Sequence, residues 1–132
     1  MHVLITGAAT GIGEATVENI HRKFPSAGFT ILDKNQHALQ ETCERLTKRG
    51  IRAHGVACDL TEIDALPDLV RRAEADMGDI ELLVNNAGIM LVEDFSTMSW
   101  EKGMLTMNLN LIAPVRLMHA VGREMLQARP EL

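Results

Sequence analysis

The chain has 132 residues, of which 46% are hydrophobic and 23% charged, and its formal net charge is −5. These values indicate one globular domain and exclude a disordered or fibrous chain. An acidic balance without a basic run argues against nucleic-acid binding. Cys43 and Cys58 fall inside apolar patterns, so we expect buried free thiols rather than a disulfide framework. With no signal peptide and no apolar run of about 18 residues, we expect a soluble, cytoplasmic protein without membrane contact.

The first predicted element is a buried strand over His2–Thr6, a short run of apolar and β-branched residues. Residues 6–13, TGAATGIG, follow with three glycines and no charge. A helix is predicted over Glu14–Phe24, because apolar residues recur there at helical spacing. The residues expected on its inward face are Ile12, Ala15, Thr16, Ile20 and Phe24.

The next part of the chain repeats this alternation. Gly28–Asp33 and Ile51–Cys58 are predicted strands, because apolar residues dominate the first and alternate with polar ones in the second. Between them, a helix is predicted from Gln36 to about Arg49, with Asn35 as its cap. Its inward residues are expected to be Leu39, Cys43 and Leu46.

A third helix is predicted to follow, with Asp64 as its cap, Pro67 in its first turn and Gly78 after its end. The run Ile80–Val84, IELLV, then predicts a fourth strand, and its apolar character is typical of a strand covered on both faces. Four strands that alternate with helices predict an α/β fold with a parallel sheet.

The last predicted element is a long helix from Ser99 to about Gln127, with a kink at Pro114. One apolar stripe along it is widened by a second group of residues. The stripe consists of Met104, Met107, Leu111, Val115, Met118 and Met125, and the second group of Leu105, Leu109 and Ile112. Core packing is the main expectation for this surface.

The glycine-rich segment predicts a site for phosphate groups. A helix N-terminus offers free N–H groups and a partial positive charge, and glycines let the backbone approach a pyrophosphate. We expect Gly7 to make the turn, and Gly11 and Gly13 to allow close approach and close packing of the helix on the sheet. No Lys-Ser/Thr pair follows, which disfavours a triphosphate-binding loop. A tight loop without a ligand is the alternative.

Asp33 points to the identity of the ligand. It ends the second strand 20 residues after Gly13, where an acidic residue would bind the adenine ribose of a dinucleotide. A carboxylate there accepts from ribose hydroxyls and repels a 2′-phosphate, and position 10 is Thr rather than a basic residue. NAD is therefore favoured, but Lys34 leaves NADP open. A solvated strand-end carboxylate is the alternative.

Three motifs in this order resemble those of the short-chain dehydrogenase/reductase family. Residues 6–13 resemble its T-G-x-x-x-G-I-G loop, Asp59-Leu60 its aspartate after the third strand, and residues 85–88, NNAG, its motif after the fourth. The resemblance covers the whole chain. It implies a single NAD(P)-binding domain over residues 1–132 with a Rossmann-like, doubly wound parallel sheet. The sheet would be limited to about four strands in the order 3-2-1-4, followed by a long C-terminal helix.

The resemblance also implies hydride transfer between NAD or NADP and an alcohol or carbonyl substrate. Asn110, within NLIAP, is similar to the family's active-site asparagine, and Asn108 is the alternative. The alternative for Asp59 is a helix-capping or turn aspartate, and the alternative for residues 86–88 is a structural turn. No metal site is expected. The implied cofactor-binding residues are Gly7, Thr10, Gly11, Ile12, Gly13, Asp33, Lys34, Asp59, Leu60, Asn86, Ala87 and Gly88.

One part of the family's machinery is missing from these residues. The family donates a proton from the tyrosine of a Y-x-x-x-K motif, and this sequence contains no tyrosine. We therefore expect the cofactor-binding half of an oxidoreductase, inactive by itself. The alternative is a catalytically silent nucleotide-binding or interaction module.

The family's strand order also predicts that Ile80–Val84 is an open sheet edge here, which favours association. In the family, the long helix often takes part in a dimer contact, so its methionine-rich stripe fits either that contact or core packing. We expect a homo-oligomer rather than a monomer.

Overall fold

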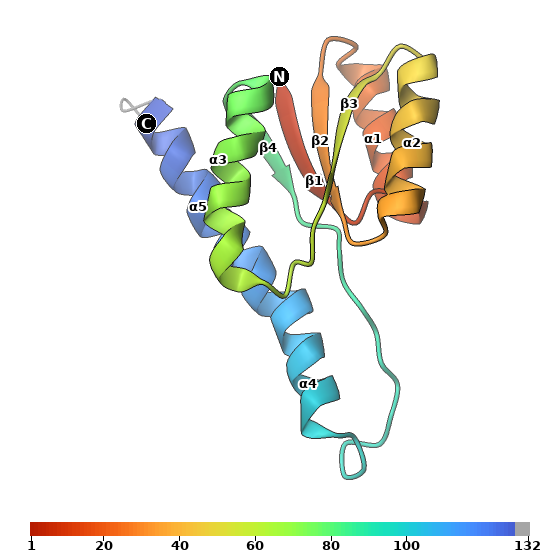
Figure 1. Ribbon diagram of the computed structural model, residues 1–132, viewed down its shortest axis with the longest axis vertical. Coiled ribbons are helices and arrows are strands. Elements are labelled where there is room, and N and C mark those ends of the chain that lie inside the picture. The colour runs from red at the N-terminus through yellow and green to blue at the C-terminus, as the bar shows by residue number, and fades with distance from the viewer. Residues whose placement is uncertain (129–132) are drawn as a thin grey trace.

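The computed structural model describes residues 1–128, which form a four-stranded parallel sheet with helices on both faces (Figure 1). The strand order is β3-β2-β1-β4, which confirms the predicted order 3-2-1-4. The final part of the predicted domain, residues 129–132, lies outside the described residues. The strands are β1 (His2–Thr6), β2 (Gly28–Asp33), β3 (Arg52–Ala57) and β4 (Ile80–Val84).

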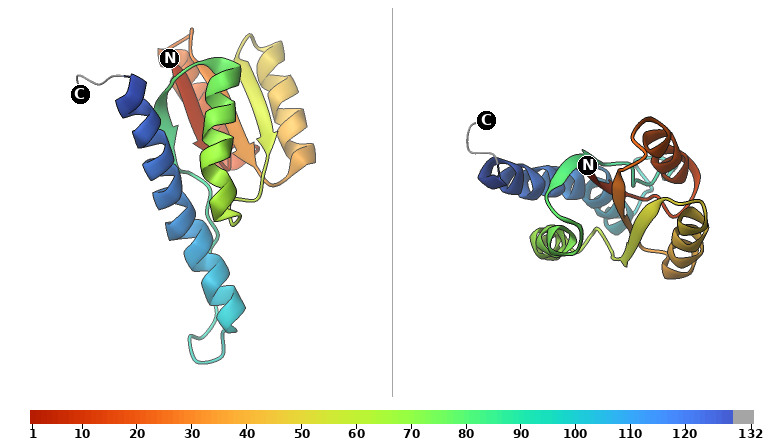
Figure 2. Two further views of the ribbon diagram at one scale, coloured as in Figure 1. Left: turned by 60° about the vertical axis from the view of Figure 1, so that its left-hand side comes forward. Right: turned by 90° about the horizontal axis from the view of Figure 1, so that it is seen from above.

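The helices form a layer on each side of the sheet (Figure 2). On one side, α1 and α2 cover β1 and β2, and on the other side α3 packs against α5. No helix within residues 1–128 is long and apolar enough to cross a membrane. The α-helices are α1 (Gly11–Lys23), α2 (Gln36–Lys48), α3 (Leu66–Met77), α4 (Trp100–Met107) and α5 (Ala113–Ala128), with a 3₁₀ turn η1 (Ile63–Ala65) and a π-helical segment η2 (Asn108–Ile112).

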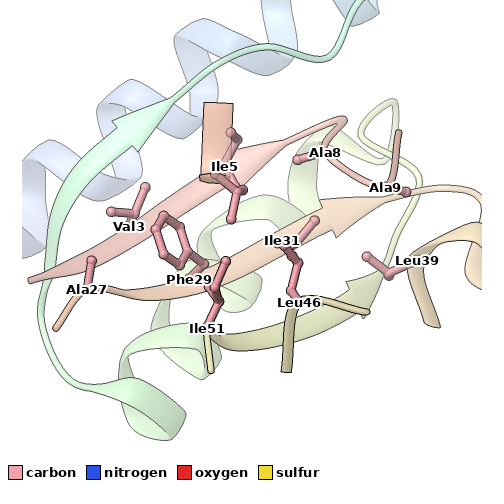
Figure 3. Packing of buried hydrophobic residues seen from close by; sticks show 11 residues of the cluster. Val3, Ile5, Ala8, Ala9, Ala27, Phe29, Ile31, Leu39, Leu46 and Ile51 are labelled. Carbon is pink, nitrogen blue, oxygen red and sulfur yellow. The ribbon is translucent and has the colours of Figure 1, made fainter. Parts of the chain in front are cut away.

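Two hydrophobic cores sandwich the central strands, because side chains alternate between the two faces of a strand. In β1, Val3 and Ile5 belong to the core under α1 and α2 (Figure 3), whereas Leu4 belongs to the core under α3 and α5. Every residue of β1 is buried. The middle of the sheet is therefore fixed from both sides, and it holds the loops at its carboxyl edge in place.

The first helix begins earlier than predicted, at Gly11 instead of Glu14. Its inward face is consequently different. Gly13 and Val17 are buried, whereas Ile12 is 80% exposed and Phe24 is 52% exposed, so the prediction that these two point inward was wrong. The reason is steric: the helix presents its glycine to the loop and strand end, which turns Ile12 outward.

The second helix agrees with its prediction. The side chain of Asn35 accepts a hydrogen bond of 3.0 Å from the N–H of Ala38, and Leu39 and Leu46 are buried. Cys43 packs against this core and Cys58 against the core on the other face, but both are only partly buried, so the expectation of buried thiols holds only in part. Both cysteines are free, as expected.

One prediction for the next elements was wrong, and another holds only in part. Asp64 does not cap α3, because it lies within η1 and the helix starts two residues later, with Pro67 in its first turn as predicted. Strand β4 is covered only in part, because Leu83 packs against the core under α3 and α5 and Val84 against the core under α1 and α2, but neighbouring residues are exposed. It is an edge strand, in which Ile80 is buried and Glu81 and Leu82 are exposed.

The predicted long helix consists of α4, η2 and α5, which follow one another without a break, but the hydrogen-bonding pattern changes in η2. Ser99 caps α4 by accepting from the N–H of Lys102, and the π-helical segment precedes Pro114. There the N–H of Ala113 donates to the carbonyl of Asn108, five residues back. Proline lacks an N–H and crowds the carbonyl four residues before it, so a widened turn forms where a kink was expected.

The apolar stripe of this helix mostly faces away from the core. The residues of α5 that pack inward are Ala113, Leu117, Ala120 and Val121. Met125 and Leu109 also pack against this core. Core packing was therefore the wrong expectation for the rest of the surface, whose exposed members are Met104, Leu105, Met107, Leu111, Ile112, Val115 and Met118.

Candidate functional site

A cleft of about 630 Å³ lies at the carboxyl edge of the sheet, where the strands meet their following loops. All the predicted cofactor residues except Gly13 line it. In a doubly wound sheet this edge is the usual place for a ligand. The lining consists of Gly7, Thr10, Gly11, Ile12, Leu32, Asp33, Lys34, Cys58, Asp59, Leu60, Thr61, Asn86, Ala87, Gly88, Ile89, Leu105 and Leu109.

The three glycines of the loop differ in what they require. Gly7 and Gly11 have φ angles of +65° and +61°, which L side chains rarely adopt. A Cβ on Gly13 would lie 2.4 Å from the carbonyl oxygen of Gly7 and 2.7 Å from Nδ2 of Asn86. Gly13 thus lies beneath the loop, which explains its absence from the cleft wall. Beside Gly11 there is no heavy atom within 4 Å, so the cleft is open there.

The amino terminus of α1 opens into this cleft. Thr10 is the N-cap residue with an extended backbone, and its side chain makes no capping bond. The first turn of an α-helix leaves N–H groups without helical partners, and the helix dipole adds partial positive charge. Together with the open space at Gly11, this arrangement suits a phosphate group.

The end of β1 is tied to the segment after β4 by a network of hydrogen bonds. The hydroxyl oxygen of Thr6 accepts from the N–H groups of Asn86 and Ala87, at 3.0 and 2.9 Å. The side-chain amide of Asn86 donates to the carbonyls of Thr6 and Gly7, at 3.0 and 2.9 Å. These bonds hold the glycine-rich loop and residues 86–88 against each other.

Asp33 ends β2 at the cleft and binds main-chain groups with both oxygens. Oδ2 accepts from the N–H of Ala9 at 3.1 Å, and Oδ1 accepts from the N–H of Asn35 at 3.0 Å. A carboxylate offers about four acceptor sites, so these two bonds leave capacity for hydroxyl groups of a ligand. The carboxylate both supports the loop and faces the cleft.

Lys34 and Asp59 face each other beside Asp33. The Lys34 Nζ lies 3.9 Å from Oδ2 of Asp59. The other oxygen of Asp59 accepts from the N–H and the hydroxyl of Thr61, at 2.9 and 2.7 Å. These bonds, the hydroxyl first, lower the pKa of Asp59, so the carboxylate is charged at neutral pH. Asp59 therefore also has the turn-forming role that was its alternative interpretation.

Cys58 lies in the same wall as a neutral thiol. Burial first, and then the nearby carboxylates of Asp33, Asp59 and Glu62, together raise its pKa to about 11. A thiol with this pKa is a poor nucleophile at neutral pH. It contributes packing rather than reactivity to the cleft. Within residues 1–128, no group of three His, Cys, Asp or Glu side chains could hold a metal ion.

Asn110 lies outside the cleft lining and binds the segment that follows residues 85–88. Its Oδ1 accepts from the N–H of Ile89 at 2.8 Å, and its Nδ2 donates to the carbonyl of Ile89 at 2.7 Å. A Cβ on Gly88 would lie 3.1 Å from this Oδ1. Asn110 thus connects the π-helical segment to the cleft wall, whereas Asn108 contributes its carbonyl to the helix.

Six residues of the lining were not predicted. Some of them had a signal in the sequence, because they adjoin predicted motif residues at strand ends. Others come from α4 and η2, whose apolar residues were expected to pack elsewhere, and no local pattern indicates that they reach the cleft. The six are Leu32, Cys58, Thr61, Ile89, Leu105 and Leu109.

Known proteins with similar sequences are dehydrogenases and reductases. A fatty acyl-CoA reductase of Mycobacterium tuberculosis is 33% identical over 129 residues, which cover 95% of this chain and 42% of that protein. A 2-dehydro-3-deoxy-D-gluconate 5-dehydrogenase of Escherichia coli is 37% identical over 111 residues, with 82% and 41% covered. The chain thus spans less than half the length of these two curated relatives.

Solved structures with the same fold include cofactor complexes. A metagenomic short-chain oxidoreductase in complex with NADP has a TM-score of 0.89 and 27% identity, over 97% of this chain and 57% of that one. The L-sorbose reductase of Gluconobacter frateurii, complexed with NADPH and L-sorbose, has a TM-score of 0.87 and 26% identity, over 96% and 48%. The family model described as short chain dehydrogenase matches residues 1–130. The chain therefore belongs to the short-chain dehydrogenase family.

Proposed function

We propose that the cleft binds a nicotinamide dinucleotide, and that the protein serves hydride transfer between the nicotinamide and an alcohol or carbonyl substrate. The observation that carries this proposal is the glycine-rich loop, which brings an open helix terminus to the cleft. Two of its glycines have positive φ, and the third has no room for a Cβ. The cofactor complexes among the similar structures support the choice of ligand class.

Each part of the cleft has a proposed role. The loop and the first turn of α1 would hold the pyrophosphate, through backbone N–H groups of residues 10–13. Asp33 and Lys34 would face the adenine ribose, and Asp59 and Leu60 the adenine. Residues 86–88 would line the other ribose. Asn110, fixed through Ile89, would hold a water for proton transfer.

Among the two dinucleotides, we propose a preference for NAD. The charge of Asp33 repels a 2′-phosphate, and its main-chain bonds keep the carboxylate in the cleft. The neighbouring cation, Lys34, lies near the carboxylate of Asp59, which offsets its attraction for a phosphate. The similar proteins cited above are complexed with NADP or NADPH, so the proposed preference for NAD depends on these side chains of this chain alone.

Titration with NADH and NADPH tests both proposals. The chain should bind NADH more tightly than NADPH, with at least one dissociation constant below about 1 mM. Asp33→Asn, which removes the charge and keeps the shape, should shift the affinity ratio toward NADPH by about tenfold. Asp64→Asn, an exposed substitution outside the cleft, is the matched control. No binding of either dinucleotide would refute the site, and an unchanged ratio in Asp33→Asn would refute the role of Asp33.

Turnover is proposed to need residues that these 132 do not include. The proton for an alkoxide must come from an acid at the substrate, and the sequence has no tyrosine for that role. We therefore expect the isolated chain to bind cofactor without oxidising alcohols or reducing ketones. Steady turnover by the purified chain would contradict this.

A further inference from the structure

The loop residue Ala9 is held from both sides by the β2–α2 unit. Its N–H donates to Oδ2 of Asp33 at 3.1 Å, and its carbonyl accepts from the hydroxyl of Thr42 at 2.6 Å. Ala9 and Thr42 are each only 1% exposed. Thr42 lies in the middle of α2, 33 residues further along the chain, and belongs to none of the family motifs. A buried carbonyl that loses such a partner is costly, because water cannot replace it.

The hydroxyl of Thr42 is itself oriented by a second pair of residues. Arg45 Nη2 donates to the Thr42 oxygen at 2.8 Å. Arg45 also donates two hydrogen bonds to Oε1 of Glu14, at 3.0 and 2.6 Å. A hydroxyl has one proton, and because its oxygen accepts from Arg45, the proton points to Ala9. Thr42 and Arg45 of α2 thereby link the loop, at Ala9, to the first turn of α1, at Glu14.

The bond to Thr42 has a consequence inside the cleft. The carbonyl of Ala9 and the N–H of Thr10 belong to the same peptide unit, which is planar and trans. In such a unit the N–H points opposite to the carbonyl. Fixing the carbonyl toward Thr42 therefore fixes the Thr10 N–H away from α2. Thr10 lines the cleft and is the N-cap of α1.

We propose that Thr42 is a positioning residue for the dinucleotide. Its hydroxyl sets the plane of the peptide between residues 9 and 10, and the Glu14–Arg45 pair orients that hydroxyl. The loop is thus held in its binding conformation before the ligand arrives, which reduces the ordering cost of binding. This inference rests on the proposed function for its effect on affinity, but its effect on the loop does not depend on a ligand.

The first test is the affinity for NADH of a set of threonine variants. Thr42→Val keeps the shape and removes the hydroxyl, and the dissociation constant should rise roughly fivefold, the value of one net hydrogen bond. Thr42→Ser restores the hydroxyl and should stay within about twofold of the unmodified chain. Thr47→Val, an exposed change on the same helix, should leave the affinity unchanged. Arg45→Met should weaken binding in the same direction by a smaller factor.

The second test needs no cofactor and separates loop anchoring from general loss of stability. Hydrogen exchange of the Ala9 N–H, which donates to Asp33, is compared with that of the Ile31 N–H in β2. In Thr42→Val, exchange at Ala9 should accelerate more than exchange at Ile31, and Thr42→Ser should restore the original ratio. Equal acceleration at both amides would mean a purely structural role and would overturn the inference.

The two tests distinguish failure of this inference from failure of the proposed function. If the unmodified chain binds NADH and Thr42→Val binds it equally well, the positioning role is refuted while the cofactor site stands. If the unmodified chain binds neither dinucleotide, the cofactor site is refuted, and the exchange ratio alone decides whether Thr42 holds the loop.

Discussion

Gly13 has no space for a side chain on the side that faces the loop. A Cβ there would lie 2.4 Å from the carbonyl oxygen of Gly7 and 2.6 Å from the Cα of Ala8. Both neighbours are backbone atoms, so they can move only if the loop moves. The requirement for glycine at this position thus comes from packing, whereas at Gly11 it comes from the positive φ. At Gly7 both reasons apply, because a Cβ there would also lie 2.8 Å from the Cα of Ala87.

Two glycine substitutions should therefore have opposite effects. Gly13→Ala should lower the free energy of unfolding by about 2 kcal/mol, because the loop must shift away from the new methyl group. Gly122→Ala, within α5 and with no heavy atom within 4 Å of its Cβ position, should raise it by about 0.5–1 kcal/mol through helix propensity. Urea denaturation followed by circular dichroism measures both. Shifts of the same sign would contradict the packing argument.

His2 is a buried titratable residue at the other end of the sheet. Its Nδ1 lies 2.7 Å from the carbonyl oxygen of Gly78, and its Nε2 lies 2.9 Å from Oγ1 of Thr30. Burial lowers its pKa below 6.5, and the bond to Gly78 opposes this shift only in part. A neutral ring that donates to the carbonyl and accepts from the hydroxyl satisfies both contacts.

The stability of the protein should consequently fall in mild acid. Between the lowered pKa of His2 in the folded state and 6.5, the unfolded chain binds more protons, so folding stability is lost as the pH falls through this range. Urea midpoints at about pH 7.5 and about pH 5.5 measure the loss. His2→Gln should reduce the difference between the two midpoints, and His37→Gln, at an exposed position, should not. Equal pH dependence in His2→Gln and the unmodified chain would assign the loss to other groups.

At the scale of elements, the π-helical segment is the feature that brings a helix side chain to the cleft wall. It places Asn110 against both main-chain groups of Ile89. Asn110→Ala should lower the free energy of unfolding by about 1 kcal/mol, since these bonds are close to solvent. It should also accelerate hydrogen exchange of the Ile89 N–H. Asn108→Ala is the control from the same segment, and acceleration at Ile89 in both variants would point to a general loosening of the helix.

The strands were predictable from sequence because each is a short segment with a clear apolar or alternating pattern, bounded by turn residues. Three of the four have the predicted bounds, and the third is shorter by one residue at each end. Helix faces were less predictable. Ile12 and Phe24 fit an inward pattern, but a glycine that must approach the loop decides how α1 is turned. Pro114 indicated an interruption, but not that a π turn would form before it.

The candidate site likewise has a part that the sequence predicts and a part that it does not. Its glycines and strand-end residues lie in short motifs, so their place at one sheet edge could be predicted. The contact of Thr42 with Ala9 and that of Arg45 with Glu14 join residues 33 and 31 positions apart. No local pattern encodes such pairs, because they depend on how α2 lies across the loop. The sequence alone therefore indicated which ligand to expect, but not what holds the loop in place.

At the scale of the molecule, the outer face of the long helix is an apolar surface. Met104, Met107, Leu111, Val115 and Met118 lie along α4, η2 and α5 with 37–53% of each side chain exposed. Exposed apolar residues gathered along one helix are typical of protein contacts. Strand β4 adds an unpaired sheet edge within the described residues. We propose that these surfaces bring copies of the chain together.

Sedimentation velocity at roughly tens of micromolar should accordingly show species larger than a monomer. The double variant Val115→Lys, Met118→Lys should shift the distribution toward the monomer, because two charges cannot be buried in an apolar contact. Phe24→Lys, an equally exposed apolar residue at the end of α1, is the control and should leave the distribution unchanged. A single monomeric species for the unmodified chain would refute the proposal.

Strand β1, which precedes the other three strands in this chain, lies in the middle of the sheet (Figure 1). Strand β1 pairs with β2, which ends at residue 33, and β2 pairs with β3, which ends at residue 57. The opposite rim of β1 has no neighbour until Ile80–Val84 has left the ribosome. A nascent chain that stalls after β3 and before β4 would therefore expose one backbone edge of the buried strand β1. Pairing with β4 covers that edge.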